Sequence, residues 1–293
     1  MSVQYITITA DQARQRLDNF LRTQLKGVPK THFYKIIRKG EVRVNKKRIK
    51  PEYKLQPGDV VRIPPVRVAE KIELKGVPDA LARTLKENIL LETDDFFVLD
   101  KPAGLSVHGG SEQPFGVIEA MRVIRKDCSF LDLAHRLDRD TSGCLLLAKN
   151  RVALRELHEA MRNNKVTKRY QVLVKGKWPA HLKTVTVPLL PYQEVGGEKI
   201  VLVSEEGKFS KTTFKILKYN AETTLLEATL HTGRMHQIRV HCAHSGHSIV
   251  GDRKYGDKAF SRAQGIRRLC LHAKELSFVL GGERYNVESE SPL

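Results

Sequence analysis

The sequence has few cysteines and no long apolar run. Only four cysteines occur among 293 residues, and none of them forms a C-x-x-C pair, so a zinc ribbon or redox dithiol is not expected. Cys144 and Cys270 lie in apolar stretches, which indicates buried, reduced thiols. No apolar stretch approaches the roughly 18 residues that cross a bilayer, and the N-terminus lacks a signal peptide's apolar segment. We therefore expect a cytoplasmic protein without membrane contact.

Two common cofactor signatures are also missing. No G-x-G-x-x-G motif is present, which argues against a dinucleotide-binding fold. Eleven histidines are present, but no H-E-x-x-H zinc motif. His231, His236 and His241 recur every five residues, a spacing that does not place them on one helix face. The sequence therefore predicts no metal site.

Acidic residues are scarce relative to basic ones. The chain holds 33 Asp and Glu against 51 Lys and Arg, a net charge of +18. Residues 1–71 alone contain 17 basic and 6 acidic residues, a net of +11, and the remaining 222 residues carry only +7. Positive charge attracts polyanions, and neutralised phosphates supply much of the binding energy of nucleic acids. The charge distribution predicts a nucleic-acid partner, with a solvated charged face as the alternative.

The N-terminal region combines helical and strand patterns with dense positive charge. Helical spacing of apolar residues covers 11–24 and 30–39, and short strand patterns cover 42–45 and 60–64. A basic loop at 46–50 separates the strand patterns. The basic residues that we expect to contact RNA are Lys30, Lys35, Arg38, Lys39, Arg43, Lys46, Lys47, Arg48 and Lys50.

This region resembles the alpha-L RNA-binding domain, the type named after small-subunit ribosomal protein four. The segments RLDNFL, RKGEVRVNKKRI and LQPGDVV carry the resemblance, which spans about residues 15–75. It implies contacts with RNA backbone and shape rather than with base sequence. We place this domain at residues 11–75, followed by a linker at 76–90.

Residues 91–293 alternate strand and turn signals with few helices. Buried-strand patterns occur at 96–99 and 144–150, and helical patterns at 115–125 and 151–162. Many short strands with few helices predict an α+β fold around a mixed, mainly antiparallel sheet. Further strand patterns lie at 170–176, 212–217, 224–230, 276–280 and 284–289.

The densest polar cluster is AHRLDRDTSG at residues 134–143, directly before an apolar strand pattern. Loops beside buried strands commonly carry functional residues. Neighbouring arginines would keep Asp138 or Asp140 ionised and nucleophilic. The residues alone leave two interpretations open, carboxylate chemistry and an Arg–Asp network that only fixes the loop.

HRLDRDTSG resembles the signature loop of the RluA-type pseudouridine synthases. Four further blocks match that family in the same order, so the resemblance spans residues 11 to about 290. These blocks are KPAGLSVHGG at 101–110, KRYQVLVKG at 168–176, TGRMHQIRVH at 232–241 and LCLHAKELSF at 269–278.

The resemblance implies a role for each residue that matches a family motif. Asp138 corresponds to the essential aspartate, and Arg239 to the arginine that pairs with it. Tyr170 corresponds to the aromatic residue that stacks on the target base, and Arg136 to the residue that fills the gap left by a flipped nucleotide. Leu271 is expected to line the uracil pocket. We expect Asp140, two residues beyond Asp138, to be a structural partner of an arginine or of the backbone within the loop.

The resemblance also implies the reaction, the isomerisation of uridine in large-subunit ribosomal RNA by a monomeric enzyme. No atom is gained or lost, so no cofactor or metal is expected. A non-catalytic RNA-binding or ribosome-assembly protein is one alternative, although it would have no use for a paired aspartate. A glycoside hydrolase is another, but it needs two carboxyl groups about 5–10 Å apart and no basic RNA-binding region.

Overall fold

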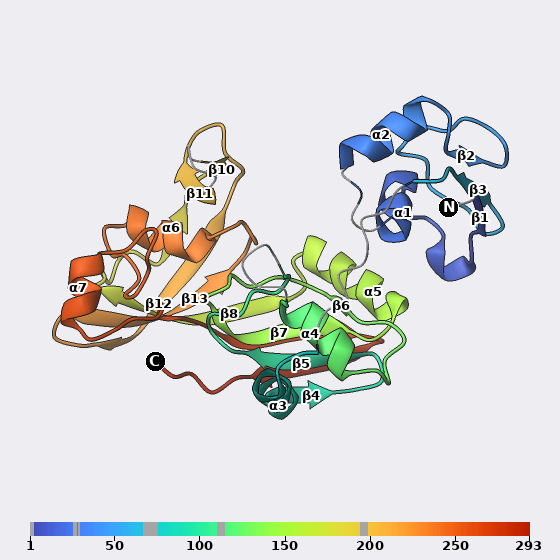
Figure 1. The fold of residues 1–293 in the computed structure, drawn as a ribbon. Helices are drawn as coiled ribbons and strands as arrows, with labels where there is room; N and C mark the ends of the chain where they lie inside the picture. The colour runs from blue at the N-terminus through green and yellow to red at the C-terminus, as the bar shows by residue number, and fades with distance from the viewer. Residues whose placement is uncertain (1–2, 26–27, 29, 67–75, 110–114, 194–198) are drawn as a thin grey trace. The chain divides into compact units, whose positions relative to one another are not determined.

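The computed structural model describes residues 3–25, 28, 30–66, 76–109, 115–193 and 199–293. The chain divides into two compact units, Met1–Lys75 and Gly76–Leu293 (Figure 1). Each unit has its own apolar core.

The first unit contains a small antiparallel sheet with strand order β1-β3-β2. Its helices are amphipathic and bury Leu17, Phe20 and Phe33 against the sheet residues Val61 and Ile63. The elements are β1 (Gln4–Thr7), a 3-10 turn (Ala10–Gln12), α1 (Leu17–Gln24), α2 (Lys30–Arg38), β2 (Arg43–Val44) and β3 (Val60–Ile63).

The first helix is shorter than the expected 11–24 and begins at Leu17. Arg14 has a φ of +65°, which lies outside the helical region. The backbone N–H of Arg14 donates to the carbonyl of Leu55, and that of Leu17 donates to the carbonyl of Tyr53. Pairing with this distant segment satisfies backbone groups that a longer helix would have used internally. The expectation for the first part of this helix was therefore wrong.

The basic residues expected to contact RNA lie on the surface of the first unit. Eight of the nine are exposed, and the side chain of Lys30 lies outside the described residues. The exposed ones are Lys35, Arg38 and Lys39 at the end of α2 and Arg43, Lys46, Lys47, Arg48 and Lys50 around the β2 turn.

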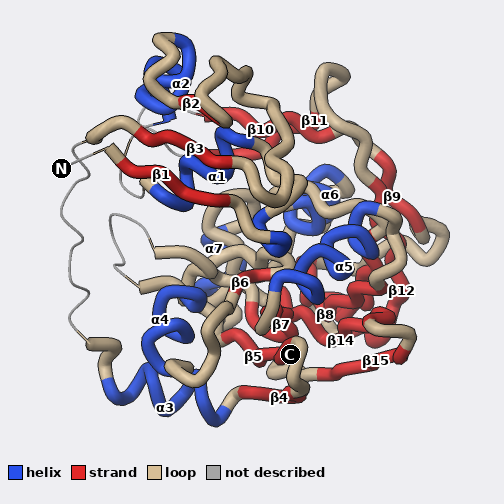
Figure 2. Tube along the Cα trace, turned by 90° about the vertical axis from the view of Figure 1, so that its right-hand side faces the viewer, coloured by secondary structure: helices blue, strands red, loops and turns tan. Residues whose placement is uncertain are grey.

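The second unit is built on one large sheet with strand order β4-β5-β7-β14-β8-β13-β12-β9 (Figure 2). Strand β15 pairs with β14, and β6 pairs with β7. All pairings are antiparallel except the short β7–β14 contact, so the predicted mixed, mainly antiparallel α+β fold is confirmed. The strands are β4 (Ile89–Glu92), β5 (Phe96–Lys101), β6 (Asp132–Leu133), β7 (Ser142–Ala148), β8 (Thr167–Lys175), β9 (Thr184–Thr186), β12 (Lys211–Tyr219), β13 (Thr223–Leu230), β14 (Leu271–Leu280) and β15 (Glu283–Glu288).

Helices cover both faces of this sheet. Alternate residues of a strand point to opposite faces, and Phe97 and Leu99 of β5 join one apolar cluster whereas Phe96 and Val98 join another. The first cluster includes residues of α3, α4 and α6, and the second includes Leu157 of α5. The helices are α3 (Asp79–Glu87), α4 (Val117–Ile124), α5 (Arg151–Arg162), α6 (Gln237–His244) and α7 (Lys258–Ala263).

Residues 76–90, which we expected to form a linker, belong instead to the second unit. They contain α3 and the start of β4. Leu85 of α3 is completely buried, and Leu81 packs beside it against the core. Burial of this apolar face holds the segment on the domain.

A two-stranded hairpin of β10 (Leu189–Gln193) and β11 (Lys199–Val203) projects from the second unit (Figure 1). Leu189 and Val201 pack with Val240 of α6 in a small apolar cluster. The hairpin is thereby fixed to the helix that carries Arg239. No helix among the described residues is long and apolar enough to cross a membrane.

Candidate active site

Asp138 lies in the loop between β6 and β7, which is tied to the body of the domain on both sides. The amine of Lys101 is completely buried and donates to the carbonyls of Pro102, Leu105 and Arg139 at 2.8, 2.8 and 2.9 Å. Burial lowers the pKa of Lys101 from 10.5 to about 8. Lys101 therefore fixes the backbone of Arg139, the residue that follows Asp138.

His135 fixes the other side of the loop. Its Nε2 accepts the backbone N–H of Leu146 on β7 at 3.1 Å. Burial lowers the pKa of His135 to about 3, so the imidazole is neutral and able to accept at this nitrogen. The loop that carries Asp138 is thus anchored before and after the aspartate.

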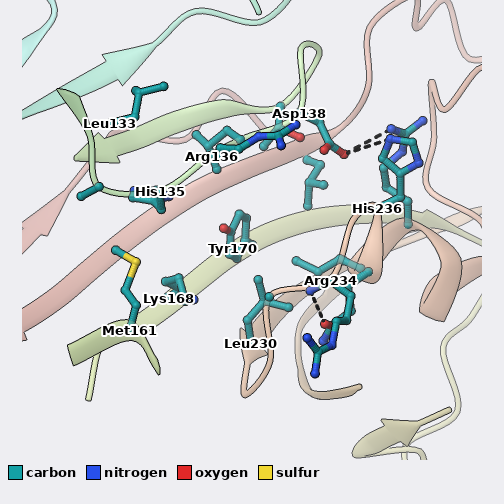
Figure 3. Close-up of a pocket in the computed structure, with 18 of the residues that line it drawn as sticks. Leu133, His135, Arg136, Asp138, Met161, Lys168, Tyr170, Leu230, Arg234 and His236 are labelled. Atoms are coloured by element: carbon teal, nitrogen blue, oxygen red, sulfur yellow. Dashed lines mark hydrogen bonds and ion pairs between the residues drawn. The ribbon is translucent and has the colours of Figure 1, made fainter. Parts of the chain in front are cut away.

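The Asp138 carboxylate is paired with Arg239 of α6. Its Oδ2 lies 3.2 Å from Nη1 of Arg239, and its side chain is 28% exposed, whereas that of Arg239 is 7% exposed. His236 faces the same oxygen, with its Nε2 3.9 Å away (Figure 3). The family resemblance assigned Asp138 and Arg239 to one site, and the fold brings them into contact across 101 residues of sequence.

Arg239 is itself held by Asp252, a residue that the sequence reasoning missed. The guanidinium donates from Nε and Nη2 to Asp252 Oδ2 and Oδ1 at 2.7 and 2.8 Å. Burial alone would raise the pKa of Asp252, but the Arg239 hydrogen bonds outweigh it and keep the pKa below its usual value. The one signal in the sequence is the polar turn GDRKYGD at 251–257, between two of the matched blocks.

The charge of Arg239 is secure despite its burial. Desolvation opposes its ionisation, but Asp252 and Asp138 together raise its pKa above the usual value. Arg239 lies on α6 and is buried. Because the buried face of α6 carries this charged residue, the helix lacks the apolar stripe by which a buried face is recognised in a sequence.

Asp138 borders a cleft of about 620 Å³ (Figure 3). Its apolar wall contains Tyr170 of β8 and Leu271 of β14, both expected at the site, and Leu230 of β13. Arg136 is exposed and also borders the cleft. Among the other lining residues are Leu133, Met161, Lys168, Arg234, His236 and Ile238.

Tyr170 forms part of the cleft wall but is only 7% exposed. Its strand neighbour on β13 is Ala228, a small residue that leaves room for the ring. Burial, and then the charge of Asp138, raises the pKa of Tyr170 well above its usual value. Its hydroxyl therefore stays protonated at neutral pH.

A second cavity of about 910 Å³ adjoins the first, and Asp138 borders both. Arg136, Arg234 and Arg239 line both cavities as well. The cationic residues that line only the second cavity are Arg139, Arg253, Lys254 and Lys258. Asp138 thus stands between a cavity with an apolar wall and one rich in cations.

Asp140 is separate from the pair of Asp138 and Arg239. Its Oδ1 lies 3.5 Å from Nε of the neighbouring Arg139, an ion pair in which both side chains are nearly half exposed. Within the described part of the chain, no group of three or more His, Cys, Asp and Glu residues is placed to hold a metal ion.

Comparison with known proteins identifies the families to which the two parts of the chain are similar. Residues 95–244 match the RNA pseudouridylate synthase family, and residues 15–61 match the S4 domain family. The chain is 54% identical to the ribosomal large subunit pseudouridine synthase C of Escherichia coli K12, in an alignment that covers 100% of this chain and 93% of that protein. It is 53% identical to the protein of the same name from Haemophilus influenzae, in an alignment that covers 94% of this chain and 87% of that protein.

Two solved structures are similar over most of the chain. Human RNA pseudouridylate synthase domain containing 4 superposes with a TM-score of 0.61 at 25% identity, over 73% of this chain and 92% of that one. Human RNA pseudouridylate synthase domain containing 1 superposes with a TM-score of 0.58 at 25% identity, over 70% of this chain and 83% of that one. With a family match over half of its length and close relatives along all of it, the chain belongs to the RNA pseudouridine synthase family, whose members are isomerases.

Proposed function

We propose that this chain converts specific uridines of large-subunit ribosomal RNA to pseudouridine, with Asp138 as the catalytic carboxylate. The observation that carries the proposal is the Asp138–Arg239 pair at the edge of a cleft of about 620 Å³. The substrate class is supported by the names of the 54% identical relatives and by the S4 domain match at residues 15–61.

The reaction breaks the bond between C1′ of the sugar and N1 of uracil, and then joins C1′ to C5 of the same base. The C5 proton is lost and N1 gains one, so the atoms balance without a redox step. Asp138 would either attack C1′ or remove a sugar proton to start departure of the base. Both routes require an ionised carboxylate, and Nη1 of the buried Arg239 lies 3.2 Å from Oδ2 of Asp138.

The other cleft residues would bind the nucleotide. A base stacked in RNA is out of reach, so it must be flipped into the cleft. Tyr170 would stack on the base, which recovers about 1–3 kcal/mol of the flipping cost, and Leu271 would complete the apolar wall. Arg136, which is exposed and borders both cavities, would enter the gap left in the RNA.

The first unit would hold the RNA by its backbone. Its exposed basic residues at the end of α2 and around the β2 turn suit phosphate contacts. Such contacts position a substrate but carry little sequence information. The choice of uridine would then depend on the RNA structure presented to the second unit.

The test replaces Asp138→Asn, which removes the charge and keeps the size. We expect loss of specific pseudouridines in large-subunit ribosomal RNA from cells that carry only the variant, together with unchanged RNA affinity of the purified protein. Asp140→Asn makes the same chemical change two residues away and should preserve modification. Normal modification by Asp138→Asn would exclude the proposed mechanism. Binding without modification by the wild type would favour an assembly factor instead.

A further inference from the structure

The two oxygens of the Asp138 carboxylate differ in their surroundings. Oδ2 faces two nitrogens, Nη1 of Arg239 at 3.2 Å and Nε2 of His236 at 3.9 Å. Among the described residues, no hydrogen bond reaches Oδ1. One oxygen is therefore placed to be held by the protein, and the other is left for the substrate.

His236 is directed at Asp138 by an unusual backbone conformation. It precedes the first residue of α6 and has φ +53° and ψ +20°, in the left-handed region. Non-glycine residues rarely adopt this conformation, and where they do the strain is often tied to function. Here it directs a side chain that is 11% exposed toward Asp138 at the cleft.

The hydroxyl of Tyr255 lies beside one ring nitrogen of His236 and bears on which nitrogen carries the proton. The Tyr255 hydroxyl accepts the backbone N–H of Val201 on β11 at 2.8 Å and lies 2.7 Å from Nδ1 of His236. Its own hydrogen needs an acceptor, and Nδ1 is in range. If Nδ1 accepts, the neutral imidazole carries its hydrogen on Nε2, the nitrogen that faces Asp138.

The same tyrosine also supports the arginine. Its ring lies 5.1 Å from the Cζ atom of Arg239, a cation–π contact. The ring and the hydroxyl of Tyr255 thus contact the two residues that face Asp138 Oδ2. Burial outweighs the nearby carboxylates and lowers the pKa of His236, which favours the neutral form.

We propose that His236 is a positioning residue for Asp138, which donates from Nε2 to Oδ2 and leaves Oδ1 to act on the sugar. The distance of 3.9 Å exceeds a hydrogen bond, and such contacts often tighten only when substrate is bound. Tyr255 holds His236 in the required tautomer. The inference rests on the proposed role of Asp138 in the reaction.

The test compares substitutions at His236 that place a hydrogen-bond donor at different positions. The single-turnover rate and the RNA affinity are measured for each variant. Gln places an amide donor near the position of Nε2, whereas Asn places one near Nδ1 and tolerates the left-handed backbone. We expect the rate of His236→Ala and His236→Asn to fall about 10- to 100-fold, as when a reacting group is misplaced. His236→Gln should recover most of the rate, and all three variants should bind RNA as the wild type does. Similar rates in the Gln, Asn and Ala variants would overturn the proposal, whether those rates are low or normal.

Tyr255→Phe removes the hydroxyl that contacts His236 and keeps the ring over Arg239. We expect a smaller fall in rate, and no additional effect when it is combined with His236→Ala, because Tyr255 acts through His236. Additive losses in the double variant would show that the two residues act separately. His181→Ala, at an exposed histidine that lines neither cavity, is the control and should keep the rate.

The outcome is separable from that of the proposed function. If Asp138→Asn is inactive while His236→Ala retains full rate, only the role of His236 is lost. If Asp138→Asn retains its rate, the proposed function itself fails. Melting temperatures of all variants identify losses that arise from unfolding.

Discussion

Asp252 accepts hydrogen bonds from two of the three guanidinium nitrogens of Arg239, with its oxygens 2.7 and 2.8 Å from Nε and Nη2. The side chain of Asp252 is itself fully buried. Only Nη1 remains to face Asp138. The backbone N–H groups of Lys254 and Tyr255 also donate to Asp252 Oδ1, which fixes the carboxylate in turn. The orientation of the arginine at the site is therefore set by a residue that lines neither cavity bordered by Asp138.

Removing the charge of Asp252 should disturb both stability and catalysis. Breaking a buried ion pair leaves an uncompensated charge and costs about 3–5 kcal/mol, so we expect Asp252→Asn to lower the free energy of unfolding by an amount near the lower limit, since Asp138 remains. A displaced guanidinium should also reduce the single-turnover rate by about 10- to 100-fold. Urea unfolding and rapid-quench assays measure the two effects. Asp127→Asn changes an exposed carboxylate that is paired with Arg125, and as the control it should change neither.

The role of Tyr170 can be tested by changes of different size. If the ring stacks on the flipped base, Tyr170→Phe should retain activity and Tyr170→Leu should lose a stacking energy of about 1–3 kcal/mol, or roughly 5- to 150-fold in rate. The hydroxyl stays protonated, so its removal changes no charge. Loss of activity in the Phe variant would mean that the hydroxyl, rather than the ring, is required. Unfolding curves must accompany the assay, because Tyr170 is buried.

Lys101 should give stability a distinctive pH dependence. The unfolded chain holds this proton up to about pH 10.5, whereas the folded protein releases it near pH 8. Between these values the unfolded state binds more protons, so the contribution of Lys101 to the free energy of unfolding rises with pH. The variant Lys101→Met should show no such rise. It also leaves three carbonyls without a donor, which should lower the free energy of unfolding by about 1–3 kcal/mol at neutral pH.

Urea unfolding of wild type and Lys101→Met from pH 7.5 to 10 checks this expectation. The stability difference between the two proteins should widen as pH increases through that window. An exposed lysine on β12, Lys218, provides the matched change Lys218→Met, which should show no such trend. A constant difference across the window would mean that the folded pKa of Lys101 is not lowered.

The basic turn of the first unit should control RNA affinity rather than chemistry. Replacing Lys46, Lys47 and Arg48 by Gln should weaken RNA binding and reduce the slope of log K against log salt by up to about 0.9 for each phosphate that is no longer neutralised. The single-turnover rate at saturating enzyme should stay unchanged. Filter binding at several salt concentrations measures the slope. The same number of charges removed at Lys208, Lys215 and Lys218, all exposed in the second unit, is the control and should have a smaller effect.

Much of the fold could be predicted from local patterns. The helix expected at 151–162 is α5 with the same bounds, and the strand expected at 96–99 lies within β5. Both segments have strong periodicity and clear ends, such as the Asn150 cap before α5. The early start expected for α1 failed because backbone groups of residues 53 and 55 bond to those of residues 14, 15 and 17, which no local pattern reports.

The candidate site could be predicted only in part. Asp138 and Arg239 were placed together by resemblance to a family, since residues 101 positions apart give no local sign of contact. Asp252 and Tyr255 were missed because an aspartate and a tyrosine in a polar turn look like ordinary surface residues. Their function depends on what packs against them, and Asp252 is completely buried against Arg239.

The sequence by itself determined the excess of positive charge, the alternation that builds the sheet and the loop that carries Asp138. These features depend on composition and on near neighbours along the chain. Only the tertiary structure decided which oxygen of Asp138 is held, which residue orients Arg239 and which nitrogen of His236 faces the cleft. Those properties arise from burial and from contacts between distant segments, because a charge buried from water must be paired by groups that the fold alone brings within reach.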